Sequence, residues 1–443
     1  MHRIGRALPS ALSVVGSLIL VLAGPLLQPA AAQATSAGQA PLSGAPEAGR
    51  NLSAYLLTAE PGDRVWELFG HNGVLIRDES TGFEGVYHYG LFDMYSDGFV
   101  PRFLRGEMMY MSGVSELTWF LASYGAANRR VWAQRLDLTP AQLGELRRLL
   151  DESVAPENRT YRYDYFRNNC STRIRDILDQ VLGGELSAAN DTVRGGDDPV
   201  TWRTHTRRLT APLTGDGLLG YLGIQLLLGP KGDEGTTVWQ EAWVPMRLRD
   251  QVGALRLHRG GGPGVPLEAS RAVWSESDRE PPPSRPPTRA PWFLLAGLLM
   301  AGLFWAAARS AAGGSRPARL PGALLGATWG LLTGLLGLLF VAVHWTDHEF
   351  MYWNQNVLIF SPLGLALSVL LPLAHLRSAS GPWLRRLTGA TLGLAAIAAI
   401  LWLIPWTRQG NGDWLLLALP VCGTLWWVAW RGLPPDAVSG VAE

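Results

Sequence analysis

The stretch Phe166–Leu182, FRNNCSTRIRDILDQVL, sets a cysteine directly after two asparagines and before a regular apolar pattern. The apolar residues recur at helical spacing, at Ile174, Ile177, Leu178 and Val181. The pattern predicts that Cys170 lies at the N-terminus of a helix. Unsatisfied backbone N–H groups at such a position favour a thiolate, lower the pKa of the thiol and can bind an oxyanion.

Two β-rich stretches precede this helix and each carries a histidine. FGHNGVLI, which begins at Phe69, reads as a turn that enters a strand with His71 at its start. In VYHYG, which begins at Val86, the two-residue period turns His88 away from its tyrosine neighbours and toward His71 across the ladder. A histidine within reach of Cys170 would complete a pair of nucleophile and base. The alternatives are an ordinary turn histidine at 71 and an exposed or core histidine at 88.

The surrounding region, residues 51–258, mixes short strands with helices. Strands are predicted at Ser53–Leu57, Asn72–Arg77 and Gly85–Tyr89, and helices at Pro140–Asp151 and Ser171–Leu182. This pattern predicts an α+β domain of ordinary size.

The N-terminal segment predicts export of this domain. Residues 1–34 combine Arg3 and Arg6 with an apolar run at Ala11–Leu27 and a small-residue stretch at Ala30–Ala32, the layout of a secretory signal peptide. An uncleaved anchor helix is the alternative. Residues 35–50, rich in Ala, Gly, Ser and Pro, are predicted to form a flexible linker.

The chain has two cysteines, Cys170 and Cys422, and the second lies in an apolar segment near the C-terminus. A pairing between them is not expected. An unpaired cysteine in an exported domain indicates a reactive thiol, an intermolecular bridge or a buried bystander.

Residues 259–291 contain GGGPGVP and PPPSRPP and are predicted to form an extended tether. Residues 292–431 then hold five apolar stretches, each close to the roughly 20 residues that a membrane-spanning helix needs. These stretches are Trp292–Ala308, Leu320–Val343, Val357–Leu376, Leu387–Trp406 and Trp414–Trp430. Residues 432–443 remain as a tail.

Arginines fix the predicted topology. They follow the first, third and fifth stretches, at positions that include Arg309, Arg377 and Arg431, and the positive-inside rule makes these ends cytoplasmic. An odd number of spans then places the α+β domain outside the cytoplasmic membrane, as the signal peptide also predicts. The net charge of +1 is too small to indicate a basic surface that binds nucleic acid, so no nucleic-acid partner is expected.

The same topology puts the loop His344–Asn356, HWTDHEFMYWNQN, on the outer face beside the domain. This loop is either an ordinary interfacial turn or the membrane-side wall of a substrate site. His344 and His348 would suit a metal only if the loop were helical, and we expect neither a metal nor a cofactor.

The order of these motifs resembles known proteins. A histidine strand, a second polar strand and an Asn-Cys helix start are similar to the circularly permuted papain-like fold of NlpC-related and lecithin:retinol acyltransferase-like proteins. FGHNGVLI, VYHYGLFD, NNCSTRIRD and WNQNVLIFSPL together resemble the Lnb-type lipoprotein intramolecular transacylases across most of residues 51–376. The expected fold is therefore an α+β permuted papain-like extracytoplasmic domain followed by an all-α bundle of five transmembrane helices.

The resemblance also implies roles for individual residues. Cys170 corresponds to the nucleophile, His71 to the general base and acid, and His88 to the group that orients His71. Substrate contacts are implied for four further residues: Asn169, Arg173, Asn354 and Asn356. The alternative for Arg173 is a place on a solvated charged face of the helix. The alternative for Asn354 and Asn356 is that they cap a helix end before Pro362.

These expectations converge on a multi-pass protein of the cytoplasmic membrane that transfers acyl groups from membrane lipid or lipoprotein esters through an S-acyl cysteine. One alternative is a peptidoglycan amidase or peptidase of the NlpC-like class, for which the tether would let the domain reach outward. The other is a non-catalytic membrane protein in which Cys170 is merely buried.

Overall fold

The computed structural model describes residues 49–193, 200–212, 215–259, 263–313, 315–377 and 379–431. The predicted signal peptide at 1–34, residues 35–48 of the predicted linker and the predicted tail at 432–443 lie outside the described residues.

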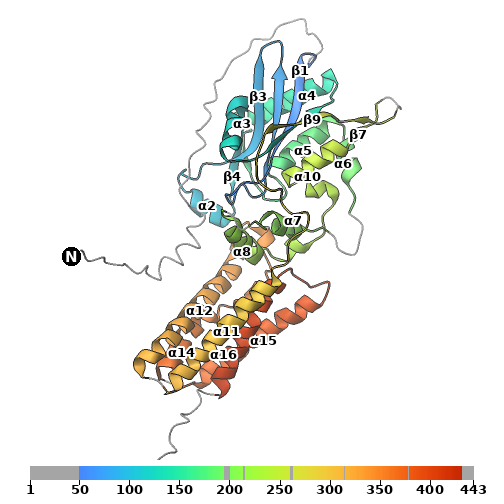
Figure 1. Ribbon diagram of the computed structural model, residues 1–443. Coiled ribbons are helices and arrows are strands. Elements are labelled where there is room, and N and C mark those ends of the chain that lie inside the picture. The colour runs from blue at the N-terminus through green and yellow to red at the C-terminus, as the bar shows by residue number, and fades with distance from the viewer. Residues whose placement is uncertain are drawn as a thin grey trace, which may run out of the picture. The chain divides into compact units, whose positions relative to one another are not determined.

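A seven-stranded antiparallel sheet organises the first part of the chain (Figure 1). Its strand order is β6-β4-β3-β2-β1-β5-β9. The strands are β1 (Leu52–Ala59), β2 (His71–Asp78), β3 (Phe83–Leu91), β4 (Met109–Glu116), β5 (Val131–Leu136), β6 (Thr160–Arg162) and β9 (Glu268–Ser275). The three strands that the sequence predicted correspond to β1, β2 and β3.

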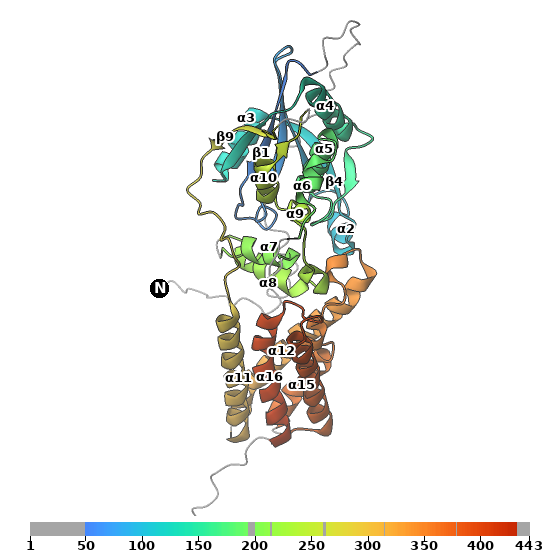
Figure 2. The same cartoon turned by 90° about the vertical axis from the view of Figure 1, so that its right-hand side faces the viewer.

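Helices cover both faces of this sheet (Figure 2). Because side chains alternate along a strand, β2 buries Val74 on one face and Leu75 on the other. On the Leu75 side lies α3 (Leu117–Ala126), and on the Val74 side lie α4 (Pro140–Val154), α5 (Cys170–Val181) and α10 (Pro245–Ala254). The predicted helices at Pro140–Asp151 and Ser171–Leu182 correspond to α4 and α5.

Short elements fill the remainder of this domain. The α-helices are α2 (Phe99–Arg105), α6 (Glu185–Asn190), α7 (Trp202–Leu209), α8 (Gly217–Leu227) and α9 (Val238–Glu241). The 3₁₀ turn η1 (Pro230–Asp233) follows α8, and β7 (Arg256–Leu257) pairs with β8 (Val265–Pro266).

The predicted tether at residues 259–291 is wrong in its central part. Residues Glu268–Ser275 form β9, which pairs with β5 along the edge of the sheet, and Trp274 packs on Tyr55 with ring centroids 5.2 Å apart. Arg279 then forms a two-pronged ion pair with Asp63, at 2.7 and 2.5 Å. The strand was not predicted because glycine-rich and proline-rich sequences flank it. Its side chains contact their neighbours only in the folded domain.

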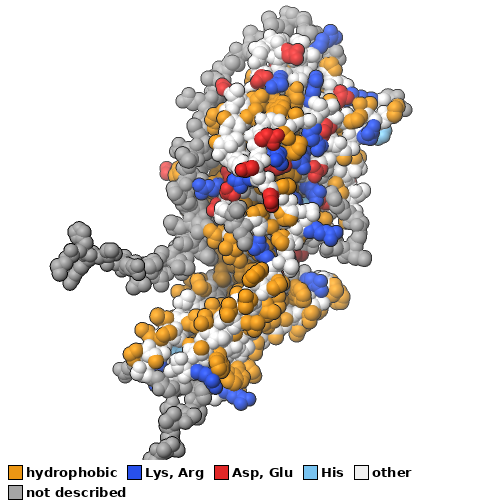
Figure 3. All heavy atoms as spheres, in the orientation of Figure 1, with side chains coloured by type: hydrophobic (Ala, Val, Ile, Leu, Met, Phe, Trp, Pro, Cys, Tyr) orange, Lys and Arg blue, Asp and Glu red, His pale blue; other side chains and the backbone are white. Residues whose placement is uncertain are grey.

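Five helices follow that are long and apolar enough to cross a membrane. These spans run over Ala290–Ala311, Pro317–Trp345, Asn356–Arg377, Pro382–Leu403 and Gly412–Arg431. They correspond to α11 (Ala290–Gly313), α12 (Arg316–Ala342), α13 (Asn356–Ile359) with α14 (Gly364–Arg377), α15 (Pro382–Leu403) and α16 (Gly412–Arg431). Two 3₁₀ turns, η2 (Val343–Trp345) and η3 (Glu349–Met351), lie in the loop after α12. Figure 3 shows apolar side chains over this part of the surface and charged side chains over the sheet domain.

The third span departs from a single continuous helix. It is interrupted between Ile359 and Gly364, because Pro362 has no backbone N–H and disfavours a helical conformation at the residue before it. At the coarse level the prediction is confirmed: a mixed α/β sheet domain precedes five long apolar helices.

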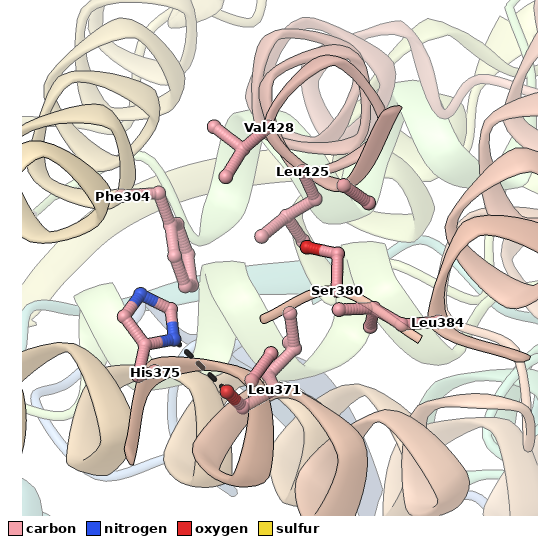
Figure 4. Close-up of a pocket in the computed structure, with 9 residues that line it drawn as sticks. Phe304, Leu371, His375, Ser380, Leu384, Leu425 and Val428 are labelled. Carbon is pink, nitrogen blue, oxygen red and sulfur yellow. Dashed lines mark hydrogen bonds between the residues drawn. The ribbon is translucent and has the colours of Figure 1, made fainter. Parts of the chain in front are cut away.

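A small cavity of about 20 Å³ lies within the membrane helices (Figure 4). His375 borders it and holds its ring by a contact of 2.9 Å between Nδ1 and the carbonyl oxygen of Leu371. The lining residues come from the spans and from the connection before α15, so this cavity is no part of the surroundings of Cys170.

Candidate active site

Cys170 is the first residue of α5, as the sequence predicted, and Asn169 caps the helix. The Asn169 Oδ1 accepts hydrogen bonds from the backbone N–H groups of Ser171 and Thr172, both at 2.9 Å. Its Nδ2 donates to the carbonyl oxygens of Tyr165 and Trp243. Asn169 is buried and its amide is committed to the protein, so these contacts give it the role of fixing the start of α5. Its substrate-binding role stays a prediction.

Three backbone N–H groups act to lower the pKa of the Cys170 thiol: those of Asn72, Cys170 itself and Ser171. These donors favour the thiolate, as predicted for a helix N-terminus. Burial nevertheless dominates and raises the pKa of the Cys170 thiol to about 11. The expectation of a lowered pKa was therefore wrong, because it considered the helix end and not the depth at which the fold buries it.

His71 and His88 lie together, as predicted. Gly73 pairs with His88 across β2 and β3, which puts His71, two residues earlier, on the same face as His88. The Nε2 atom of His71 lies 3.3 Å from Nδ1 of His88, and Nε2 of His88 lies 2.8 Å from the Ser115 hydroxyl. The three side chains form a hydrogen-bonded row that ends on β4.

Both imidazoles are neutral at physiological pH. Burial is the main cause that lowers the pKa of His88, to about 4. The pKa of His71 is lowered well below its usual value, first by burial and then by His88 and the positive charge of Arg129. A neutral imidazole can accept the proton of a thiol that comes within its reach.

The start of β2 links the surroundings of the thiol to the first histidine. The backbone N–H of Asn72, the residue directly after His71 in β2, lowers the pKa of the thiol, while the His71 ring lies on the α3 face of the sheet and stacks on Tyr124. On its other side Cys170 meets Gly90, where an added Cβ would lie 3.7 Å from the Cys170 Cβ. Gly90 has a φ of +82°, a conformation that L side chains rarely adopt, so a glycine suits this position.

Arg129 was missed by sequence reasoning. It is buried, its Nε donates to the Glu60 carbonyl oxygen at 2.8 Å, and its guanidinium lies 4.6 Å from the ring centre of Tyr124. Tyr124 in turn stacks on His71, with centroids 6.2 Å apart. Among the described residues, Arg129 Nη2 has no hydrogen-bond partner. An arginine between α3 and β5 carries no distinguishing sequence signal, because only the fold brings it to the site.

Arg173 lies on α5, three residues after Cys170. Its Nε donates to Asn168 Oδ1 at 2.9 Å, and its guanidinium lies 3.9 Å from the ring centre of Tyr161. These contacts hold Arg173 against the protein surface. Binding of a lipid head group by Arg173 stays a prediction.

Asn354 and Asn356 are fully buried between the loop after α12 and the end of α8. Asn354 Nδ2 donates to the carbonyl oxygens of Leu226 and Leu227, and Asn356 Nδ2 donates to that of Leu226. Asn354 Oδ1 accepts from Gln409 at 2.8 Å. Such contacts are those of a structural connection between the domain and the membrane helices, and the contact of these two asparagines with substrate stays a prediction.

His344 and His348 do not form a metal pair on one helix, because the loop consists of two 3₁₀ turns with an extended stretch between them. His348 Nε2 lies 2.9 Å from the Phe103 carbonyl oxygen, and His344 stacks on Tyr352. Within the described residues, no group of three or more His, Cys, Asp or Glu side chains is arranged to hold a metal ion.

Comparison with known proteins assigns the part of the chain that carries this site. Residues 48–208 match the family model of the Lnb N-terminal periplasmic domain, a range that includes Cys170, His71 and His88. Searches of curated proteins and of solved structures found no match. The family resemblance read from the motifs is thereby confirmed for this domain, and the chain is a multi-pass membrane protein that carries an Lnb-type periplasmic domain.

Proposed function

We propose that this protein is a membrane-anchored cysteine acyltransferase that takes acyl chains from lipid or lipoprotein esters at the outer face of the cytoplasmic membrane. The observation that carries the proposal is the setting of Cys170, a buried thiol at a helix N-terminus whose pKa is lowered by the backbone N–H of Asn72, the residue that directly follows His71 in the row of two histidines. This combination supplies a nucleophile, a base and an oxyanion site.

The first half-reaction forms an acyl enzyme. His71 accepts the thiol proton while Cys170 Sγ attacks the ester carbonyl, and the N–H groups around the sulfur stabilise the oxyanion. When the intermediate collapses, the ester C–O bond breaks, the leaving alcohol takes the proton from His71 and a thioester remains on Cys170.

The second half-reaction returns the thiol. An amine attacks the thioester carbonyl, its proton passes to His71, the C–S bond breaks and the sulfur recovers that proton. The N-terminal amine of the same lipoprotein is the acceptor that the family resemblance suggests, and the products are then an N-acyl group and a lyso ester. The order of the two histidine strands before the cysteine helix supports a permuted papain-like arrangement for this chemistry.

Contacts with the membrane part support a lipid substrate. Asp347 and Glu349, in the loop after α12, pair with Arg162 at 2.7 Å and with Arg167 at 3.2 Å. Glu349 also pairs with Lys231 at 2.7 Å. Together with the buried amide contacts of Asn354 and Asn356 to α8, these ion pairs join the domain to the loop between two spans, where acyl chains need not leave the bilayer to reach it.

The peptidoglycan alternative rested on a long tether. The central part of that segment is the edge strand β9, so less of it is left to act as a tether that would let the domain reach outward. Peptidoglycan cleavage and a non-catalytic role remain as outcomes of the test below.

The test uses the purified full-length protein in lipid bilayers that contain a diacylated lipopeptide. The proposal predicts a mass increase of one acyl chain on Cys170 that hydroxylamine removes. Cys170→Ser abolishes this adduct, whereas Cys422→Ser, the matched change at the other cysteine, retains it. If no adduct forms and peptides are released from added peptidoglycan, the protein is a peptidoglycan hydrolase and the acyltransferase proposal is wrong.

A further inference from the structure

A second cavity, of about 270 Å³, lies between α2, β4 and the loop that follows β3. Six of its lining side chains are aromatic or thioether groups: Phe92, Phe99, Phe103, Met108, Met109 and Met111. Methionine and phenylalanine offer apolar surface, and methionine adapts its shape to flexible ligands. The other five lining residues are polar or charged: Asp93, Ser96, Arg102, Glu107 and Thr160. The apolar part of the lining suits a flexible hydrocarbon chain.

A row of aromatic rings leads from this cavity toward Cys170. Phe92 stacks on Tyr110 with centroids 4.9 Å apart, and Tyr110 packs on Tyr163 with centroids 4.5 Å apart. The Tyr163 ring lies against Gly90, which also faces Cys170. The cavity and the thiol are thus on two sides of one short stack of rings.

Helix α2, which lines the cavity, contacts the loop that follows α12. In Figure 2, α2 lies against the segment that follows α12. The backbone N–H of Asp347 donates to the Arg105 carbonyl oxygen at 2.7 Å. In the same loop, Trp345 is 79% exposed, as expected for a ring at the bilayer interface.

The elements that form the cavity also carry apolar side chains that are about half exposed: Val100 and Leu104 of α2, at 51% and 52%, and Met109 of β4, at 51%. Arg102, which lines the cavity, donates to the Asp97 carbonyl oxygen at 2.7 Å. An apolar rim next to an interfacial loop is suited to a lipid tail.

We infer that this Phe/Met cavity binds the fatty acyl chain that Cys170 transfers. The chain leaves the bilayer beside the loop after α12 and lies along α2, and its carbonyl end passes the Tyr110 and Tyr163 rings to reach the thiol. This inference rests on the proposed acyltransferase function and adds to it the subsite that recognises the hydrocarbon tail.

Chain-length preference tests the subsite. Full-length protein is offered palmitoyl and acetyl thioesters, and the adduct on Cys170 is measured by mass spectrometry. Met111→Trp fills the cavity and is expected to lower the ratio of palmitoyl to acetyl adduct by about tenfold or more, whereas Met111→Leu, of similar size, keeps the wild-type ratio. A ratio that Met111→Trp leaves unchanged overturns the subsite without affecting the proposed chemistry.

A second measurement does not depend on catalysis. The Cys170→Ser protein in bilayers is irradiated with a photoactivatable palmitate, and the cross-linked peptides are sequenced. The inference predicts cross-links in residues 92–111 that Met111→Trp removes. Cross-links confined to the membrane helices would overturn the subsite even if Cys170 forms an acyl enzyme, and cross-links at 92–111 without any acyl enzyme would overturn the proposed function alone.

Discussion

The imidazole of His71 lies 3.3 Å from that of His88, Nε2 to Nδ1, while the far nitrogen of His88 lies 2.8 Å from the Ser115 hydroxyl. A neutral imidazole has one donor and one acceptor nitrogen, so a row of this kind couples the tautomers of the two rings. The proposed mechanism uses the pattern in which His71 Nε2 donates to His88 and His71 Nδ1 is left to accept the thiol proton.

Substitutions along the row should have graded effects on acyl transfer. His71→Gln removes the base and is expected to lower the rate of acyl-enzyme formation by about 10²–10⁴. Ser115→Ala removes one hydrogen bond to the orienting ring and should cost less than about tenfold. Rates of Cys170 acylation in the full-length variants check this order. Equal losses in both variants would contradict a row in which His71 alone accepts the proton.

The raised pKa of Cys170 predicts how the reactivity of the resting thiol depends on pH. With a pKa of about 11, the thiolate fraction and hence the rate of alkylation by iodoacetamide should rise about tenfold per pH unit between pH 7 and 9. Arg129→Met should lower that rate, since the positive charge of Arg129 lowers the pKa of the thiol. The measurement is made in Cys422→Ser protein. A rate that is already constant below pH 7 would indicate a resting thiolate–imidazolium pair instead.

Burial of neutral His88 predicts a loss of stability in mild acid. Its pKa falls from 6.5 to about 4 on folding, so between these values the unfolded chain binds a proton that the folded protein does not. Stability is therefore complete above pH 6.5 and falls as the pH drops toward 4, by about 3 kcal/mol from this residue. Thermal unfolding of the wild type and of His88→Gln at pH 7 and pH 5 checks this. The two proteins should differ in pH dependence, and identical slopes would contradict the burial of a neutral ring.

Substitution of Asn354 distinguishes a structural role of this residue from a substrate-binding role. Asn354→Ala leaves the buried carbonyls of Leu226 and Leu227 without this donor, which costs about 1–3 kcal/mol for each group left unsatisfied. The melting temperature should fall clearly. Glu349→Gln, an exposed change in the same loop, should alter stability by no more than about 1 kcal/mol. An Asn354→Ala protein that melts like wild type but has lost acyl transfer would support direct contact with substrate.

Local sequence patterns were sufficient for much of the architecture. The strands around His71 and His88 follow from a two-residue period, the start of α5 follows from an asparagine cap before apolar residues at helical spacing, and the spans follow from length and hydropathy. Each of these signals is contained in a few neighbouring residues. The approach of His88 to His71 was also predictable, because it depends only on strand period and pairing.

Features that depend on distant parts of the chain were not predictable in this way. Strand β9 forms because β5 offers a free edge and Tyr55 offers a partner for Trp274. Arg129 comes to the site from a loop, and the raised pKa of Cys170 depends on how deeply the whole domain buries it. The amide contacts of Asn354 join segments more than a hundred residues apart.

Intact-lipid mass spectrometry of lipoproteins tests the central claim, acyl transfer through Cys170, most directly. Cells that lack other lipoprotein N-acylation would express either the wild type or Cys170→Ser, with Cys422→Ser as the control for loss of a thiol. The account predicts N-acylated lyso lipoproteins with the wild type and the control, and unmodified diacyl lipoproteins with Cys170→Ser. Lipoproteins of the same mass in all three strains would contradict it.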